Sequence, residues 1–306
     1  MTERPIHHEI STPEQSKQAL TPEEKLGEAV ALLEAGYDRI TTSEQFQDYL
    51  KTAALFHTYS DKNIMMIHMQ KPDATQIAGF NTWKKMGRYV QKGETGIRIF
   101  APMLTKFREE DQNGKERVVE ILRGFRLVSV FDVSQTDGKD LPHPPMPQDL
   151  IESSERGSWL FGEVSRWVTA QGATVEFEDL KSQNPNLHGY FRPNDNRIAV
   201  DRSMSGDQQA KTLVHEAAHL LTVNKEIPFK EREFGETVAE GTAFVVLNHF
   251  GIDTSDYSFA YIANWSENRD MMKAATNLIV STSNAIIEGI EPRQRPRGTE
   301  PPYGTN

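Results

Sequence analysis

The 306-residue sequence contains no cysteine. This absence excludes disulfide bonds, thiolate zinc sites and a cysteine nucleophile, and it fits a reducing compartment. The chain also lacks an apolar run near the roughly 20 residues that a membrane-spanning helix needs, and its N-terminal segment lacks the apolar core of a signal peptide. We therefore expect a cytoplasmic protein without membrane contact, in which any metal site uses histidine and carboxylate ligands.

A surplus of basic residues is also missing from the chain as a whole. Asp and Glu number 44 against 34 Lys and Arg, for a formal net charge of −10, which argues against nonspecific nucleic-acid binding by the whole chain. One segment differs, because residues 71–108 hold eight Lys or Arg and two acidic residues. Charge is therefore segregated along the sequence.

Proline-rich stretches and changes in hydrophobic period divide the chain into segments. We expect a disordered leader at 1–20 and a disordered tail at 291–306. Residues 21–133 read as a domain with a helical lead followed by a small antiparallel sheet. A proline-rich linker at 134–150 then leads to a second domain at 151–290. These patterns predict the α+β fold class, with two domains.

The segment His215-Glu216-Ala217-Ala218-His219 is the strongest chemical motif. In a helix, its two His lie four residues apart on one face and can reach one metal ion. The next predicted helix, at about 230–250, carries Glu236 and Glu240 on one face, and either can complete a His, His, Glu ligand set for zinc or another divalent metal. Glu216 would then act as the general base of a metal-dependent hydrolysis. The alternative is an acidic surface helix beside two buried, satisfied His, but the apolar positions around the motif favour the metal site.

Within the basic segment, aromatic and cationic side chains alternate closely. Single-stranded nucleic acid is bound by aromatic stacking together with cations along the phosphates. The competing interpretation places Phe80, Trp83 and Phe100 in the domain core, with the cations only solvating the surface. Composition alone does not decide between these readings, and for Trp83 both stay open.

Several stretches carry a family resemblance. They are Tyr59-Ser60-Asp61-Lys62-Asn63, Pro72-Asp73-Ala74-Thr75, Ala78-Gly79-Phe80-Asn81-Thr82-Trp83-Lys84-Lys85-Met86-Gly87-Arg88, Val90-Gln91-Lys92-Gly93-Glu94-Thr95-Gly96-Ile97 and Ala101-Pro102. Together they closely resemble the N-terminal domain of ArdC-type antirestriction proteins. The second half, with the His215 to His219 motif and residues 239–244, resembles the zincin-like domain that these proteins share with ImmA/IrrE metallopeptidases.

The resemblance implies an N-terminal domain that binds single-stranded DNA and a C-terminal domain with a metallopeptidase fold. Such proteins are carried on mobile elements and protect incoming DNA from host restriction. Glu240 aligns with the third metal ligand, although Gly241-Thr242-Ala243-Phe244 departs from the Ser-Val-Ala-Tyr usual after it. With the basic segment, the resemblance predicts DNA contacts from Tyr59, Asn63, Phe80, Trp83, Lys84, Lys85, Arg88, Lys92 and Arg98.

A strand at Gly189-Tyr190-Phe191, just before the metal motif, offers an edge on which an extended peptide can lie. Tyr190 is therefore a candidate for substrate binding. Two functions stay open at this point. One is a peptidase that cleaves a protein partner, such as a regulatory or restriction-system component, near DNA. The other is a protein that shields single-stranded DNA, with a metal that only supports the fold.

Overall fold

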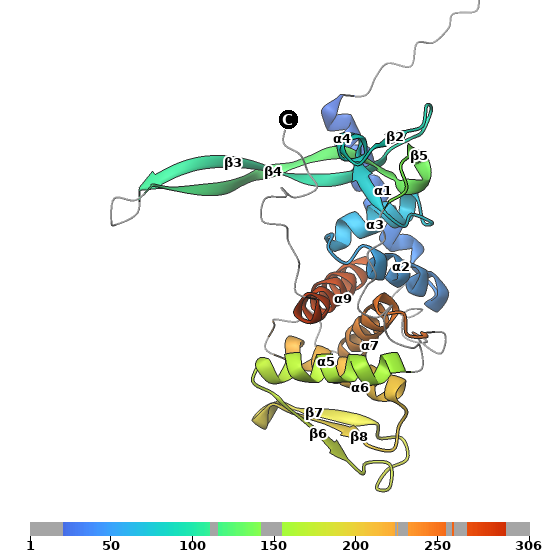
Figure 1. Ribbon diagram of the computed structural model, residues 1–306, viewed down its shortest axis with the longest axis vertical. Coiled ribbons are helices and arrows are strands. Elements are labelled where there is room, and N and C mark those ends of the chain that lie inside the picture. The colour runs from blue at the N-terminus through green and yellow to red at the C-terminus, as the bar shows by residue number, and fades with distance from the viewer. Residues whose placement is uncertain are drawn as a thin grey trace, which may run out of the picture.

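The computed structural model describes residues 21–110, 116–141, 155–223, 225, 232–254, 259 and 268–291. The expected disordered leader, most of the proline-rich linker and all but the first residue of the expected tail lie outside these residues. Within the described part, no helix is long and apolar enough to cross a lipid bilayer. The mixture of helices and small sheets confirms the α+β class (Figure 1).

Each of the three N-terminal helices begins after a residue whose side chain caps it. In α1 (Pro22–Arg39), the side chain of Thr21 accepts a hydrogen bond from the Glu24 amide and the side chain of Glu24 accepts one from the Thr21 amide. The same capping box opens α2 (Ser43–Leu55), and Ser60 caps α3 (Asp61–Gln70). Each box satisfies amides that the first helical turn leaves unpaired.

The N-terminal sheet is antiparallel, as expected, with the order β1-β4-β3. Its strands are β1 (Ile77–Gly79), β3 (Ile97–Glu110) and β4 (Glu116–Asp132). Beyond the body of the domain, β3 and β4 continue as a long two-stranded arm (Figure 1). Pro102 lies inside β3, where an edge position tolerates the missing N–H. The pairing of β3 and β4 is irregular near Gly124, with a register shift between Met103 and Leu104 and a φ of 151° at Gly124.

A second, two-stranded sheet lies beside α4 (Phe80–Lys85). It pairs β2 (Arg88–Val90) with β5 (Thr136–Gly138), which follows the short 3-10 helix η1 (Val133–Gln135). The boundary predicted at residue 134 is therefore too early, because residues 134–138 belong to the N-terminal half.

The outer edge of β3 is covered by two amide side chains of α3. Asn63 donates to the Phe100 carbonyl at 2.9 Å and accepts from the Phe100 amide at 2.8 Å. Gln70 makes the same pair of bonds with Arg98, both at 2.9 Å. These side chains occupy positions that a neighbouring strand would otherwise fill, so α3 protects an edge that is prone to unwanted pairing.

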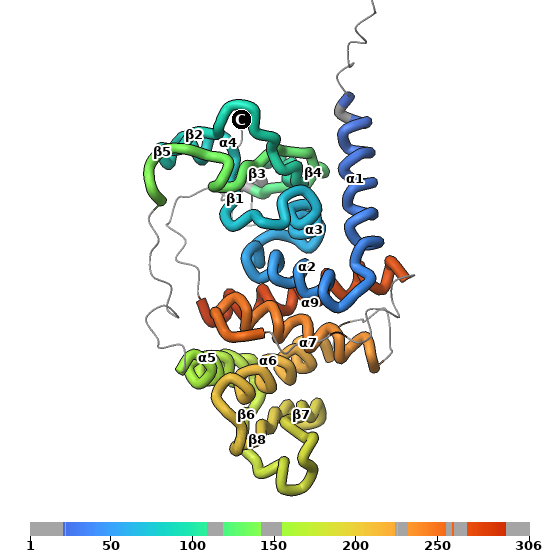
Figure 2. Tube along the Cα trace, turned by 90° about the vertical axis from the view of Figure 1, so that its right-hand side faces the viewer, coloured from blue at the N-terminus to red at the C-terminus, as the bar shows by residue number. Residues whose placement is uncertain are grey.

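The C-terminal half places a three-stranded sheet against two helices. The order is β6-β8-β7, with β6 (Thr174–Glu178) parallel to β8 (Arg197–Asp201) and β7 (Gly189–Arg192) antiparallel to it at the edge. The 3-10 helix η4 (Pro193–Asp195) joins β7 to β8. Helices α5 (Arg156–Ala170) and α6 (Gly206–Thr222) cover the sheet, and α7 (Arg232–His249) and α9 (Arg269–Ile290) lie between them and the N-terminal helices (Figures 1 and 2).

The two halves share one continuous hydrophobic core. Helix α7 packs against α2 as well as α6 and α9. At the rim, Arg269 of α9 pairs with Asp38 and Glu34 of α1, and Lys273 bonds Glu34 at 2.6 Å. The helix that carries the predicted acidic ligands is therefore held from both halves.

Candidate metal centre

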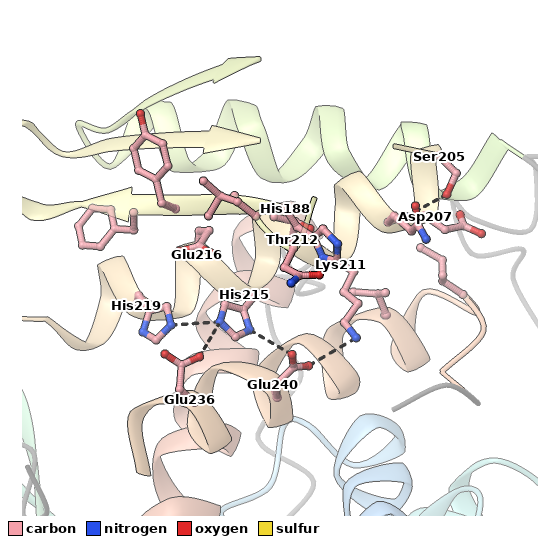
Figure 3. Close-up of a pocket in the computed structure, with 18 of the residues that line it drawn as sticks. His188, Ser205, Asp207, Lys211, Thr212, His215, Glu216, His219, Glu236 and Glu240 are labelled. Carbon is pink, nitrogen blue, oxygen red and sulfur yellow. Dashed lines mark hydrogen bonds and ion pairs between the residues drawn. The ribbon is translucent and has the colours of Figure 1, made fainter. Parts of the chain in front are cut away.

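Helix α6 presents the two His of the motif on one side and buries the other. Leu213, Val214, Ala217 and Ala218 are fully buried, which fixes the helix against the core. On the opposite side, the Nε2 atoms of His215 and His219 lie 3.1 Å apart (Figure 3). Both imidazoles therefore aim at one point, as the i, i+4 spacing predicts.

Glu236 of α7, and not Glu240, faces that point. Its Oε2 lies 3.4 Å from His215 Nε2, and ligand atoms of His215, His219 and Glu236 all lie within 4.8 Å of one another. The three side chains that converge are therefore His215, His219 and Glu236, and Glu236 lies one helical turn before the Glu240 that we expected as the third ligand. The reason is the crossing of α6 and α7, which brings the earlier turn of α7 to the Nε2 side of His215.

Glu240 approaches the other side of the same imidazole. Its Oε1 lies 3.6 Å from His215 Nδ1, and its Oε2 lies 3.6 Å from Lys211 Nζ (Figure 3). A carboxylate next to the second nitrogen of a ligating His fixes the tautomer and orientation of the ring. Glu240 is thus placed to hold His215 with Nε2 turned toward Glu236.

The electrostatic setting leaves His219 able to bind a cation. Burial, together with the charge of His215, lowers the pKa of His219 to about 4. A neutral imidazole with a lone pair on Nε2 is the form that binds a metal. Burial also acts to lower the pKa of His215, but Glu236, Glu216 and Glu240 outweigh it and raise that pKa above its ordinary value.

Glu216 lies beside these groups and is half-buried. Burial raises the pKa of its carboxyl group, and the charges of Glu236 and Glu240 add to the rise, while His215 and a hydrogen bond from the Phe191 amide oppose it. A carboxyl group with a raised pKa inside a cleft is typical of general acid-base residues.

An open cavity of about 980 Å³ adjoins the cluster. Strand β7, the edge strand, forms one wall, and α6 and α7 form the other. Gly189 allows this approach, because a Cβ there would lie 2.4 Å from Thr212 Cγ2. The predicted substrate residue Tyr190 lines the cavity, and its hydroxyl donates to Glu178 Oε1 at 2.9 Å.

Two of the predicted DNA-binding residues belong to the interior of the N-terminal half. Trp83 has no exposed surface, and its indole N–H donates to the Phe131 carbonyl at 2.9 Å. Asn63 is 5% exposed and bound to the Phe100 backbone. Our prediction that these two side chains contact DNA directly is wrong, because a buried ring cannot stack on a base and an amide whose hydrogen bonds are used within the protein cannot bind one.

Two predicted cations bind within the protein. The Arg88 guanidinium donates to the Thr136 hydroxyl and carbonyl, both at 2.8 Å, and to the Lys139 carbonyl at 2.6 Å. This side chain therefore ties β2 to β5. Arg98 pairs with Glu28 of α1 at 3.1 Å.

The remaining predicted residues lie at the surface. Phe80, Lys84, Lys85 and Lys92 are exposed, and Tyr59 is half-buried. Tyr89, which we did not single out as a contact, is 58% exposed in the middle of β2. Its position between Arg88 and Val90 in a period-2 pattern is the signal that could have identified it.

Comparisons with known proteins match two separate segments of the chain. Residues 28–131 match the family model of the N-terminal domain of anti-restriction factor ArdC, and residues 168–248 match that of the IrrE N-terminal-like domain. An uncharacterized protein of Bacillus anthracis is 28% identical over 80% of this chain and 48% of its own length, so the chain spans about half of that curated relative.

A solved structure shows a related fold. The Mn(II)-bound crystal structure of the antirestriction protein ArdC from plasmid R388 superposes with a TM-score of 0.52, at 18% identity, over 85% of this chain and 98% of that one. The resemblance carried by the sequence motifs is confirmed. The chain therefore joins a domain of the ArdC N-terminal family to a domain of the IrrE N-terminal-like family.

Proposed function

We propose that this chain is an antirestriction-type protein of a mobile element. In this proposal the N-terminal half binds single-stranded DNA, and the C-terminal half carries a peptidase centre that depends on a divalent metal. The observation that carries the proposal is the convergence of His215, His219 and Glu236 beside the half-buried Glu216, along one open cavity.

The donor set fits a divalent cation. Two imidazole nitrogens and one carboxylate are the ligands of many catalytic zinc sites, which keep one position open. The cavity lies on the open side of the three residues, and Glu240 supports His215 from behind. Zn²⁺ is the ion we expect, and Mn²⁺ is a second candidate for imidazole and carboxylate ligands.

The residues around the cluster would have separate roles in amide hydrolysis. A bound divalent ion would polarise a carbonyl and make an attacking water more acidic. Glu216 would take the proton of that water and pass it to the leaving amine. The free side of β7 would hold the substrate as an added strand, with Tyr190 beside it.

Cleavage of fluorescein-labelled casein tests the peptidase centre. The protein loaded with Zn²⁺ or Mn²⁺ should cleave the probe, and a chelator should stop it. Glu216→Gln should bind metal normally but lose about 10²–10⁴-fold in rate, whereas Glu163→Gln, on α5 and outside the cavity lining, should change nothing. Full activity of Glu216→Gln would assign the base elsewhere. Absence of cleavage by the loaded wild type would favour the other function, a DNA shield with a structural metal.

The DNA-binding proposal is supported by an exposed surface around α4 and β2. Phe80 and Tyr89 are 53% and 58% exposed, and Lys84, Lys85 and Lys92 are exposed in the same segment. No acidic residue occurs between positions 80 and 92. Aromatic rings among ammonium groups are typical of surfaces that bind single strands.

Gel-shift titration of single-stranded against duplex DNA of the same length tests this surface. We expect preference for the single strand and a log-log salt slope of about −2, from three phosphates at about 0.7 each. Lys84→Ala should reduce the slope by about one phosphate, and Lys181→Ala in the C-terminal half should not. Equal affinity for duplex DNA, or an unchanged slope in Lys84→Ala, would contradict the assignment.

A further inference from the structure

Two exposed apolar surfaces lie apart from the metal centre and from the α4–β2 surface. One is a face of the β3–β4 arm and the other is a groove at its base. We propose that they meet in a symmetric dimer, in which the arm of each copy lies in the groove of the other. This inference is independent of the proposed function.

The arm face consists of Leu104, Leu122 and Phe125. Opposite residues of antiparallel strands point to the same side, and the pairs Pro102/Phe125 and Leu104/Leu122 follow one another along the arm. The three side chains are 46%, 52% and 56% exposed. A two-stranded ribbon is marginally stable alone in water, so cover on this face would stabilise the arm.

The opposite face of the arm is less suited to docking. Its Phe107, Ile121 and Met103 are 36%, 40% and 42% exposed, each less than the three residues of the arm face, and the Arg123 guanidinium lies 5.2 Å from the Phe107 ring centroid. A cation over an aromatic face partly covers it and is favourable there. This difference points to the arm face as the contact surface.

The base groove is an open cavity of about 1220 Å³ between α1, the foot of the arm and α9. Leu26 and Val30 of α1, 42% and 44% exposed, form one wall, and Leu278 of α9 contributes to another. Phe125 belongs to both the groove and the arm face. Because the two surfaces are continuous, a twofold axis can bring both from one copy onto both from the other, as an isologous contact requires.

Charge favours a second copy as the occupant. The arm, at residues 103–110 and 116–125, holds four basic and four acidic residues, so it offers no surplus cation to release counterions from a nucleic acid. Next to the apolar pairs stands the ion pair Lys106–Glu120 at 3.5 Å. The groove lining likewise holds two residues of each sign, Glu34 and Asp61 against Lys62 and Lys273. Each surface thus has an apolar centre beside opposite charges.

Light scattering after size exclusion tests the dimer. We expect the wild type to have twice the 34.7 kDa of one chain, and the double variant Leu104→Asp, Leu122→Asp to be monomeric with unchanged metal content. Leu55→Asp, at a position 56% exposed on α2, is the matched control and should stay dimeric. A monomeric wild type up to its solubility limit, or a dimer that survives the double variant, would overturn the proposal.

Cross-linking in trans tests the contact without destabilising the arm. Because the chain has no cysteine, Leu122→Cys chains mixed with Val30→Cys chains can form the heterologous disulfide only if arm and groove meet. We expect that mixture to cross-link under mild oxidation and a mixture of Leu122→Cys with Leu55→Cys not to do so. Equal yields in both mixtures, or no product in either, would refute the arrangement.

Discussion

Trp83 and Phe80 lie three residues apart on α4, and the structure gives them different roles. Trp83 is fully buried, and Phe80 is 53% exposed. Trp83→Ala should lower the free energy of unfolding by about 3–5 kcal/mol. Phe80→Ala should leave stability within about 0.5 kcal/mol but weaken single-stranded DNA binding by about 1–3 kcal/mol. Thermal midpoints and gel shifts on both variants check this contrast, and a stable Trp83→Ala with weakened binding would reverse it.

Asp132 makes the stability of the N-terminal half depend on pH. It is 1% exposed and accepts hydrogen bonds from the amides of Thr75, Gln76 and Ser134. Burial acts to raise its pKa, but these hydrogen bonds and the Ser134 side chain outweigh burial and hold the pKa below its ordinary value. A carboxyl group with a depressed folded pKa stabilises the protein above its unfolded pKa of about 3.9, and this stability is lost as the pH falls through the folded pKa.

Urea unfolding of Asp132→Asn checks that effect. The variant should be about 1.5–3 kcal/mol less stable at neutral pH, because hydrogen bonds to a charged group are lost. Its disadvantage should shrink as the pH falls below about 3.9. A difference that stays constant down to the acid limit would show that the ionised carboxylate is not the stabilising form.

At the scale of elements, the sequence predicted the helix of the metal motif, the helix after it and the strand at residues 189–191, but not how the two helices cross. Thr21, Thr42 and Ser60 each accept a hydrogen bond from an amide in the first turn of the helix that follows, so the signal for a helix start is local. Glu236 and Glu240 lie about one helical turn, or about 5.4 Å, apart along α7. The packing of α7 on its neighbours sets which of the two reaches the His pair. Gly241 shows this packing, since a Cβ there would lie 2.4 Å from Ile279 Cδ1 of α9. The glycine that departs from the usual family pattern therefore permits a close helix contact.

The burial of Trp83 could not be read from the sequence for a similar reason. Its partner, the Phe131 carbonyl, lies 48 positions later in the chain. The spacing of Trp83 from the neighbouring Lys residues suits either a stacking platform or a core helix. Only the docking of α4 on β4 decides between them.

The cover of the β3 edge by α3 makes a further prediction. Asn63→Ala leaves the Phe100 amide and carbonyl without the Asn63 partner and should cost about 1–3 kcal/mol of stability. The exposed edge should also increase aggregation on mild heating. Lys51→Ala, at an exposed position of α2, is the control and should behave as wild type. Unchanged unfolding and light scattering in Asn63→Ala would mean that the edge needs no cover.

At the scale of the whole molecule, the shared core predicts one cooperative unfolding transition. Phe46 of α2 packs edge-on against Phe259 with ring centroids 4.9 Å apart, and Phe259 contacts Phe244 of α7. Phe46→Ala should therefore lower the melting temperature of both halves together. Calorimetry, with hydrogen exchange followed separately in the two halves, checks this. Two resolved transitions, only one of which shifts, would show independent domains.

The affinity for Zn²⁺ of three proteins, measured by competition with a chelating dye, tests the metal centre most directly. Glu240→Gln should weaken binding by about 10–100-fold, as expected when the support of a ligating His is lost. Glu236→Gln should weaken it more than this, because it removes the third ligand itself, and the wild type should bind most tightly. If Glu240→Gln lost more affinity than Glu236→Gln, the ligand set of His215, His219 and Glu236 would be wrong.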